Sequence, residues 1–294
     1  MSNYIIATSS TCDLPRTWLD EHNVPFIPYS FTINDQPTVD DCREESRAAI
    51  YAGMRNGDIL KTSQINQPAY EDFFKKLLES GKDVLFLDMS EKMSVSFQNC
   101  RAAADKIRTA YPNQKLYVMD TRCISGGLGL LVIHCVELME NGSSFEEVVA
   151  WGEENKLKIA HRFTVDDLTY LKRGGRVSNA SALVGTLLSI KPVLYVPNEG
   201  TLDVVKKCIG RKKALHAILD SVLHDMSKVD NTGRDMLILN ADCMADAEFI
   251  RDEVKRAHPE IGKIRISSLG VVIGAHCGPG LLTVFYICQD RSAE

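Results

Sequence analysis

The sequence predicts an α/β protein with two domains. We expect a mostly parallel sheet flanked by helices in an N-terminal domain (residues 1–165) and an α+β C-terminal domain (residues 166–294). The 294 residues are 45% hydrophobic, which is enough for two packed cores. β-Rich runs alternate with amphipathic helical stretches in the first half, and this alternation stops after Pro192. No flexible linker separates the halves, so we expect them to pack closely.

Short strands and helices follow one another through the first half. The β-rich runs lie at residues 4–7, 26–33, 83–89, 115–120 and 160–165. Amphipathic helices are expected after Pro68, over about 95–109, and twice within 127–157. Strands that are joined through helices form parallel pairs, so this half predicts a parallel sheet with helices on its faces.

The second half has a different order of elements. Residues 193–207, VLYVPNEGTLDVVKK, predict a β-hairpin that turns at residues 198–200. The elements expected after it are a helix near 210–227, a strand at 236–241, a helix at 244–257, and strands at 263–268 and 281–287. This mixed order is typical of an α+β domain.

Composition excludes several classes of function. The net charge is −5 and the Lys and Arg residues are scattered, so we expect no nucleic-acid partner. No segment approaches the roughly 18 apolar residues of a membrane span, and the first ten residues do not resemble a signal peptide. We therefore expect a cytoplasmic protein without stable membrane insertion. The nine cysteines lack CxxC pairs and Cys/His ligand spacing, which predicts reduced, packed thiols and no metal site.

Hydroxyl side chains are concentrated in loops that follow predicted strands, whereas the common catalytic and phosphate-binding motifs are absent. The hydroxyl-bearing segments are TSSTCD (8–13), KTSQ (61–64), MSEKMSVSFQ (89–98) and CIS (123–125). Loops at the carboxyl ends of parallel strands form the usual ligand crevice, so this pattern indicates a small polar head group. For Ser94 and Ser96, helix capping and hydrogen bonding to a carboxylate are both consistent with the position. Thr62 and Ser63 are either turn formers or ligand contacts.

An apolar helix is predicted after the basic segment LKRGGR (171–176). Its apolar face is formed by Ala180, Leu183, Val184, Leu187 and Leu188, and Pro192 ends the helix. Gly185 and Ser189 allow a close neighbour, which is either another helix or a lipid chain.

Six segments together resemble the DegV family over about residues 4–288. They are IIATSSTCDLP, KTSQ, MSEKMSVSFQ, VMDTRCISGGLG, LTYLKRGGRVSNASALVGTLLSIKP and VVIGAHCGPGLLTVFY. The resemblance implies two α/β domains that hold one long-chain fatty acid of the palmitate, stearate or oleate type, with no other cofactor. It also implies a non-catalytic role in which the carboxylate is presented to the catalytic subunit of a fatty acid kinase.

The resemblance also assigns roles to individual residues. Thr62, Ser94 and His276 match the positions that hold the carboxylate. The remaining candidates are Ser63, Ser96 and Ser125 beside the head group, Leu183, Val184, Leu187 and Leu188 along the acyl chain, and Arg173 and Arg176 on the partner surface.

Three positions depart from the family pattern. Ser9 stands where an acidic residue is usual, Val95 where glycine is usual, and Cys277 where threonine is commoner. Two other functions stay open: a stand-alone lipid chaperone or regulator, and a hydrolase that uses Cys277 with His276. The hydrolase is disfavoured, because we expect an extended chain here, in which adjacent side chains point to opposite sides and cannot readily pair as nucleophile and base.

Overall fold

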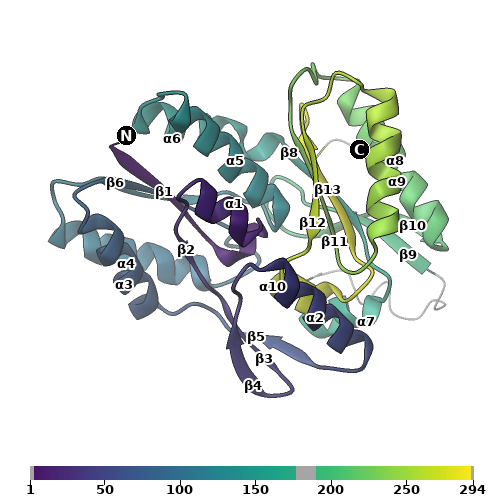
Figure 1. Ribbon diagram of the computed structural model, residues 1–294, viewed down its shortest axis with the longest axis horizontal. Coiled ribbons are helices and arrows are strands. Elements are labelled where there is room, and N and C mark those ends of the chain that lie inside the picture. Colours follow the sequence, from purple (N-terminus) through teal and green to yellow (C-terminus); the bar gives the residue numbers. More distant parts are fainter. Residues whose placement is uncertain (1–2, 177–189, 293–294) are drawn as a thin grey trace.

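The computed structural model describes residues 3–176 and 190–292, which form two lobes side by side (Figure 1). The N-terminal lobe contains a parallel sheet in the order β2-β1-β6-β7. Its strands are β1 (Tyr4–Ser9), β2 (Phe26–Ile27), β6 (Asp83–Asp88) and β7 (Leu116–Asp120). The chain passes from β1 to β2 on one side and returns to β6 on the other. Loops therefore diverge at the carboxyl ends of β1 and β6, where open α/β sheets form their ligand crevice.

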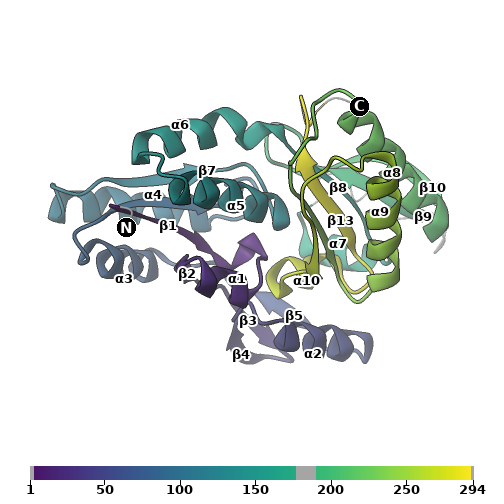
Figure 2. The same cartoon turned by 45° about the horizontal axis from the view of Figure 1, so that its top comes forward.

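Helices cover both faces of the parallel sheet (Figure 2). One face carries α3 (Gln67–Leu78) and α4 (Ser96–Ala110), and the other carries the short α1 (Arg16–Glu21), α5 (Gly126–Glu140) and α6 (Phe145–Asn155). Local signals fix the starts of two of these helices. Asn66 caps α3 and Pro68 lies in its first turn, while Ser144 and Glu147 form a capping box at α6. The helices predicted for this half are confirmed.

The helix α5 lies between the two lobes and packs against strands of both sheets. Glycines at its N-terminus make this possible. A Cβ atom on Gly126 would lie 2.6 Å from the ring of Phe285, and one on Gly127 would lie 2.1 Å from Nε2 of His161. Because both partners belong to the second sheet, the larger hydrophobic core is continuous across the two lobes.

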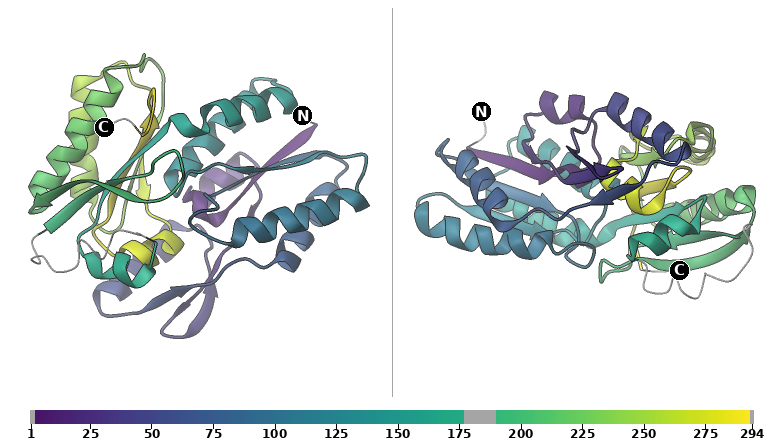
Figure 3. Two further views of the ribbon diagram at one scale, coloured as in Figure 1. Left: turned by 180° about the vertical axis from the view of Figure 1, so that it is seen from behind. Right: turned by 90° about the horizontal axis from the view of Figure 1, so that it is seen from below.

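The C-terminal lobe is a six-stranded sheet in the order β10-β9-β8-β13-β11-β12, in which only β11 and β12 are parallel. Its outer face, away from the first lobe, is covered by α8 (Arg211–Met226) and α9 (Met244–Ala257) (Figure 3). Alternate residues of β11 and β13 face α8 and α9 or the N-terminal lobe, as the two-residue period of a strand requires. The strands are β8 (Ile159–Thr164), β9 (Ile190–Tyr195), β10 (Asp203–Ile209), β11 (Met236–Asn240), β12 (Ile264–Ser268) and β13 (Leu282–Ile287).

The position of β8 differs from the sequence prediction. This strand precedes the expected boundary at residue 165, yet it pairs with β13 and β9. The sheet of the second lobe therefore begins at residue 159. All six residues of β8 are buried, so its sequence has no polar face that would identify the partner sheet.

Several short elements were not expected from the sequence. The predicted strand 26–33 is interrupted at Pro28, and its second part, β3 (Ser30–Ile33), belongs to a separate antiparallel sheet of order β4-β3-β5. The other additional elements are β4 (Gln36–Val39), α2 (Glu44–Arg55), β5 (Leu60–Thr62), α7 (Leu168–Gly174), α10 (Val271–Cys277) and two short 3-10 helices, η1 (Ser10–Cys12) and η2 (Lys156–Lys158). Apart from α2, whose 12 residues make it as long as α3, these elements are too short to show a clear period in the sequence. β5, α7 and α10 form part of the cavity described below.

A buried arginine joins the lobes on one side of the cavity. Arg47, on α2, is fully buried and donates hydrogen bonds to the carbonyl oxygens of Asp13 (3.0 Å), Leu14 (3.2 Å) and Ser268 (2.9 Å). Ser268 belongs to the C-terminal lobe. Burial raises the pKa of the Asp13 carboxyl to about 7, although Arg47 opposes this shift. Burial likewise raises the pKa of Asp40, again against the effect of Arg47.

Candidate functional site

A cavity of about 420 Å³ lies between the two lobes. Residues of the N-terminal lobe that follow β6 and β7 form one wall, and the inner face of the six-stranded sheet together with α7 and α10 forms another. The volume falls within the roughly 300–1,000 Å³ of typical ligand pockets. The crevice expected at the carboxyl ends of the parallel strands is therefore present, and the second lobe forms its opposite wall.

Thr62 and His276 meet in the wall of the cavity. Thr62 ends β5 and His276 lies on α10, and their Oγ1 and Nε2 atoms are 2.9 Å apart. Burial, and secondarily the positive charge of Arg176, lowers the pKa of His276 to about 4. The imidazole is therefore neutral at physiological pH. Gly174 allows this packing, because a Cβ atom there would lie 2.7 Å from Nδ1 of His276.

The loop before α4 supplies a further hydroxyl to the cavity. Ser94 lines the cavity, and its Oγ donates to Oγ of Ser96 (2.9 Å) and accepts from the backbone N–H of Ser96 (3.2 Å). Ser96 has a structural role: it accepts a hydrogen bond from the backbone N–H of Ile65 (3.0 Å) and is absent from the described cavity lining. The Tyr29 hydroxyl is buried beside the two serines and completes no hydrogen bond with the described residues. Tyr29 directly precedes β3 and belongs to no recognisable motif, so the sequence did not indicate a role for it.

Ser63 and Ser125 also line the cavity. The hydroxyl of Ser125 donates to Oδ2 of Asp13 (2.5 Å), behind the cavity wall. Its backbone φ of 55° lies in the region that favours glycine, so the hydrogen bond to Asp13 holds a strained residue at the start of α5. The Ser125 hydroxyl is thus held in the wall, whereas the Ser63 side chain is exposed and has no hydrogen-bond partner among the described residues.

The rest of the cavity is largely apolar. His161 contributes no charge there, because burial holds its pKa well below the usual range and both ring nitrogens are paired, with Ile124 N and Ile159 O. The apolar lining includes Met89, Met93, Phe163, Leu171, Val196, Leu202, Leu269, Val272, Leu281 and Phe285. The inward positions of β8 and β13 could have been recognised only once their pairing was known.

Comparison with known proteins identifies the family. A family model described as "Uncharacterised protein, DegV family" matches residues 4–289. The chain belongs to the DegV family. A DegV domain-containing protein of Clostridium perfringens is 33% identical over 292 residues, which cover 99% of each chain.

Two solved DegV structures have the same fold. A DegV family protein from Thermus thermophilus, described in terms of its fatty acid binding, has a TM-score of 0.86 at 28% identity, and the match covers 97% of this chain and 99% of that chain. DegV from Bacillus subtilis, described as a fatty acid binding protein, has a TM-score of 0.83 at 27% identity, with 98% and 100% covered.

The structure accounts for two departures from the DegV pattern. The Ser9 hydroxyl donates to Oδ1 of Asp88 (2.7 Å), so a carboxyl group from β6 stands beside the position where DegV sequences usually have an acidic residue. Burial raises the pKa of this carboxyl to about 6. Val95 has φ −69° and ψ −6°, a conformation open to any residue, and is 52% exposed at the edge of the cavity. Neither departure removes a cavity-lining hydroxyl.

The third departure bears on the hydrolase hypothesis. His276 and Cys277 lie on α10, so the expectation of an extended chain at this point is wrong. Burial raises the pKa of the Cys277 thiol to about 12, which suppresses the nucleophilic thiolate at neutral pH. Moreover, Nε2 of His276 is directed to Thr62. These features argue against a cysteine nucleophile in this DegV protein.

The remaining sequence candidates divide into two groups. Leu183, Val184, Leu187 and Leu188 lie outside the described residues. Arg173 is exposed and packs over the ring of Tyr170 at 5.6 Å, whereas Arg176 is exposed but also lines the cavity. Arg176 is therefore placed to attract an anion to the cavity.

The described ranges contain no group of three or more His, Cys, Asp or Glu side chains that could hold a metal ion. Within the same ranges, no helix has the length and apolarity needed to cross a membrane. All nine cysteines are unpaired, and every one except Cys243 is buried.

Proposed function

We propose that this DegV protein binds one long-chain fatty acid in the cavity between its lobes. The observation that carries the proposal is the lining of the cavity: the hydroxyls of Thr62 and Ser94 and the neutral imidazole of His276 share it with a larger number of apolar side chains. The Thermus thermophilus and Bacillus subtilis relatives, both described as fatty acid binding, support the same ligand class.

The head-group chemistry follows from the neutral state of His276. When the neutral ring carries its proton on Nε2, that N–H donates to Oγ1 of Thr62 and leaves the Thr62 hydroxyl hydrogen free to be donated to a carboxylate. Ser94 provides a second hydroxyl by turning away from Ser96 when ligand arrives. Neutral donors leave the carboxylate more nucleophilic than a bidentate ion pair with a buried arginine would. Arg176, being exposed, attracts the anion without burying a positive charge against it.

The acyl chain supplies most of the affinity. Burying ~15 methylenes at ~0.8 kcal/mol each contributes about 12 kcal/mol, against an association penalty of roughly 4–15 kcal/mol. Each hydroxyl hydrogen bond to the charged carboxylate adds about 1.5–3 kcal/mol. The head-group residues therefore orient the ligand and select the carboxylate.

The finer proposal is that the held carboxylate is presented to the catalytic subunit of a fatty acid kinase. Thr62, Ser94 and His276 are all partly exposed. The exposed Arg173 and Arg176 lie on either side of Gly174, which packs against His276. A partner that carries a nucleotide could approach this basic surface. A stand-alone lipid chaperone would bind the same ligand but would yield no acyl phosphate when mixed with kinase and ATP.

A Thr62→Val variant tests the carboxylate site. Valine keeps the branched shape but removes the hydroxyl, so we expect palmitate to bind about 10-fold to 100-fold more weakly. The affinity for hexadecanol, which has the same chain length without a charge, should fall much less. Titration calorimetry with both lipids measures the difference. Thr109→Val, on the exposed end of α4, is the matched control. Equal losses for palmitate and hexadecanol would contradict the assignment of Thr62 to the head group.

A further inference from the structure

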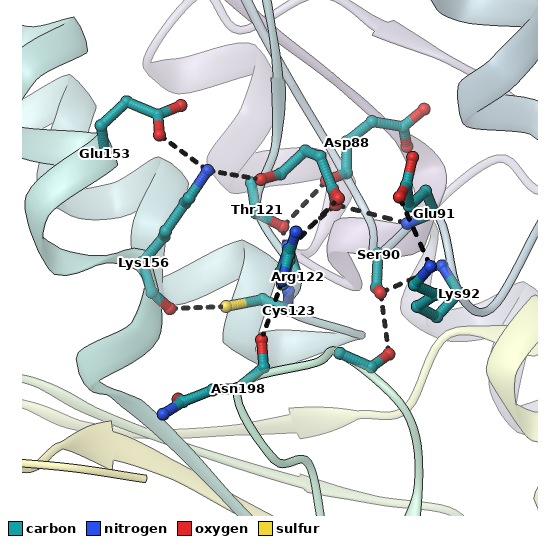
Figure 4. Close-up of polar contacts among 12 residues, drawn as sticks. Asp88, Ser90, Glu91, Lys92, Thr121, Arg122, Cys123, Glu153, Lys156 and Asn198 are labelled. Carbon is teal, nitrogen blue, oxygen red and sulfur yellow. Dashed lines mark hydrogen bonds and ion pairs between the residues drawn. The ribbon is translucent and has the colours of Figure 1, made fainter. Parts of the chain in front are cut away.

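Two hydrogen bonds connect the N-terminal lobe to the turn between β9 and β10 (Figure 4). Ser90 Oγ donates to the carbonyl oxygen of Gly200 (2.7 Å), and Nη1 of Arg122 donates to that of Asn198 (3.4 Å). Both donors follow strands of the parallel sheet, β6 and β7, at their carboxyl ends. These contacts therefore join the crevice of one lobe to a hairpin of the other.

Ser90 also shapes the loop that carries Ser94. Its backbone N–H donates to the carbonyl oxygen of Cys123 (2.9 Å), and its own carbonyl oxygen accepts from the N–H of Met93 (3.0 Å). Its Oγ accepts from the N–H of Lys92 (3.2 Å). Ser90 is completely buried, so these bonds are shielded from water. One side chain thus fixes the turn leading to Ser94 and attaches it to the other lobe.

Gly200 is fitted to this contact in two ways. Its φ of +81° is a conformation that L side chains rarely adopt. In addition, a Cβ atom there would lie 2.3 Å from Oγ of Ser90 and 3.1 Å from Cβ of Arg122. No side chain could be accommodated while the hydrogen bond from Ser90 remains.

The contact joins two parts of the cavity wall. Val196 and Leu202 flank the turn and line the cavity from the C-terminal lobe. Met89, Met93 and Ser94 flank or follow Ser90 and line it from the N-terminal lobe. A change in the contact therefore alters both the closure of the wall and the position of the Ser94 hydroxyl.

On the N-terminal side of the contact, Asp120 holds the two loops that carry Ser90 and Arg122. Its Oδ1 accepts hydrogen bonds from the N–H groups of Arg122 (3.0 Å) and Glu91 (3.3 Å), so the loops after β6 and β7 are held together. Lys156 donates to the carbonyl oxygen of Asp120 (2.9 Å) and pairs with Glu153 (2.7 Å). Because these bonds hold the loops after β6 and β7 to each other, separation of the two walls requires the bonds to the turn at Gly200 to break.

We propose that Ser90 is a positioning residue that couples closure of the cavity wall to placement of the Ser94 hydroxyl. The proposal rests on the proposed binding of a fatty acid in this cavity. With the bond to Gly200 in place, Ser94 is held where it can receive the carboxylate. Without that bond, the loop before α4 is released, and the protein loses much of its selectivity for a carboxylate head group over an uncharged one.

The test compares palmitate and hexadecanol binding to the wild type, Ser90→Ala and Gly200→Ala. We expect both variants to lower the preference for palmitate over hexadecanol roughly threefold to tenfold, the effect of one hydrogen bond. A general loss of stability would weaken the binding of both lipids equally, so the ratio of the two affinities would stay unchanged. Ser80→Ala is the matched control, because it removes a serine–carbonyl hydrogen bond, to Leu77, within one lobe.

The outcomes separate the two proposals. If the wild type binds palmitate but both variants keep its ratio of palmitate to hexadecanol affinity, only the role of Ser90 is overturned. Wild-type protein that binds no palmitate overturns the proposed function and this inference with it. Thermal unfolding of each variant verifies that it is folded, and Gly200→Ala tests the same contact from the opposite lobe.

Discussion

Replacing Arg47 with methionine is expected to destabilise the protein by about 3–5 kcal/mol, because the change leaves buried acidic groups without their positive partner. Arg47 is fully buried, and its guanidinium bonds to carbonyl oxygens of both lobes. Methionine fills much of the same volume but offers no donor. Chemical denaturation measures the change in the free energy of unfolding.

The loss in the Arg47 variant should depend on pH. Without the guanidinium, the pKa of Asp13, already raised to about 7 by burial, rises further, and that of Asp40 also rises. A raised pKa makes a carboxyl stabilise the fold more at low pH, and this contribution is lost as pH rises through the folded-state value. Destabilisation should therefore be smaller at pH 5 than at pH 8.

The matched control for Arg47 is Arg55→Met on the same helix. Arg55 pairs with Asp242 of the other lobe, but both side chains are about half exposed. An exposed pair of this kind contributes about 0–1 kcal/mol. Two results would contradict this account of how Arg47, Asp13 and Asp40 join the lobes. One is a similar loss of stability in both variants, and the other is a loss in the Arg47 variant that does not change between pH 5 and pH 8.

A tryptophan in place of Val272 should strongly weaken the binding of long-chain fatty acids. Val272 lines the cavity on α10, one helical turn before His276, so the two side chains share a face of the helix. An indole ring that displaces about four methylenes of the ligand removes roughly 3 kcal/mol, on the order of 100-fold in affinity for palmitate. Titration calorimetry with palmitate measures this loss.

The effect at Val272 must be distinguished from unfolding. Overpacking a filled core costs about 1–3 kcal/mol, whereas a ring that enters an existing cavity should leave the melting temperature nearly unchanged. Val39→Trp, on the exposed strand β4, is the control for adding an indole elsewhere. A folded Val272→Trp protein with wild-type affinity for palmitate would mean that the ligand does not occupy this cavity.

The sequence was sufficient for the main elements of both lobes because their helices and strands have clear periods and turn signals. It could not assign β8 to a sheet, since a strand buried on both faces has no alternation that identifies its partner. It also missed α10, whose seven residues span two turns and include Gly274. The error at α10 mattered most, because it concealed how His276 reaches Thr62.

The candidate site was accessible from sequence only in part. Thr62, Ser94 and His276 come from segments far apart in the chain, and family resemblance, rather than periodicity, grouped them. The structure places all three on one cavity. Tyr29 and the contact between Ser90 and Gly200 could not be inferred, because they depend on loop conformations and on how the two lobes meet.

Native mass spectrometry of the protein purified from cells tests the central claim most directly. If the cavity holds a fatty acid, the spectrum should contain the chain plus the mass of one saturated or unsaturated acid of about 16–18 carbons, and the adduct should vanish under denaturing conditions. Only the bare chain after incubation with excess palmitate, or an adduct of a different chemical class, would contradict fatty acid binding.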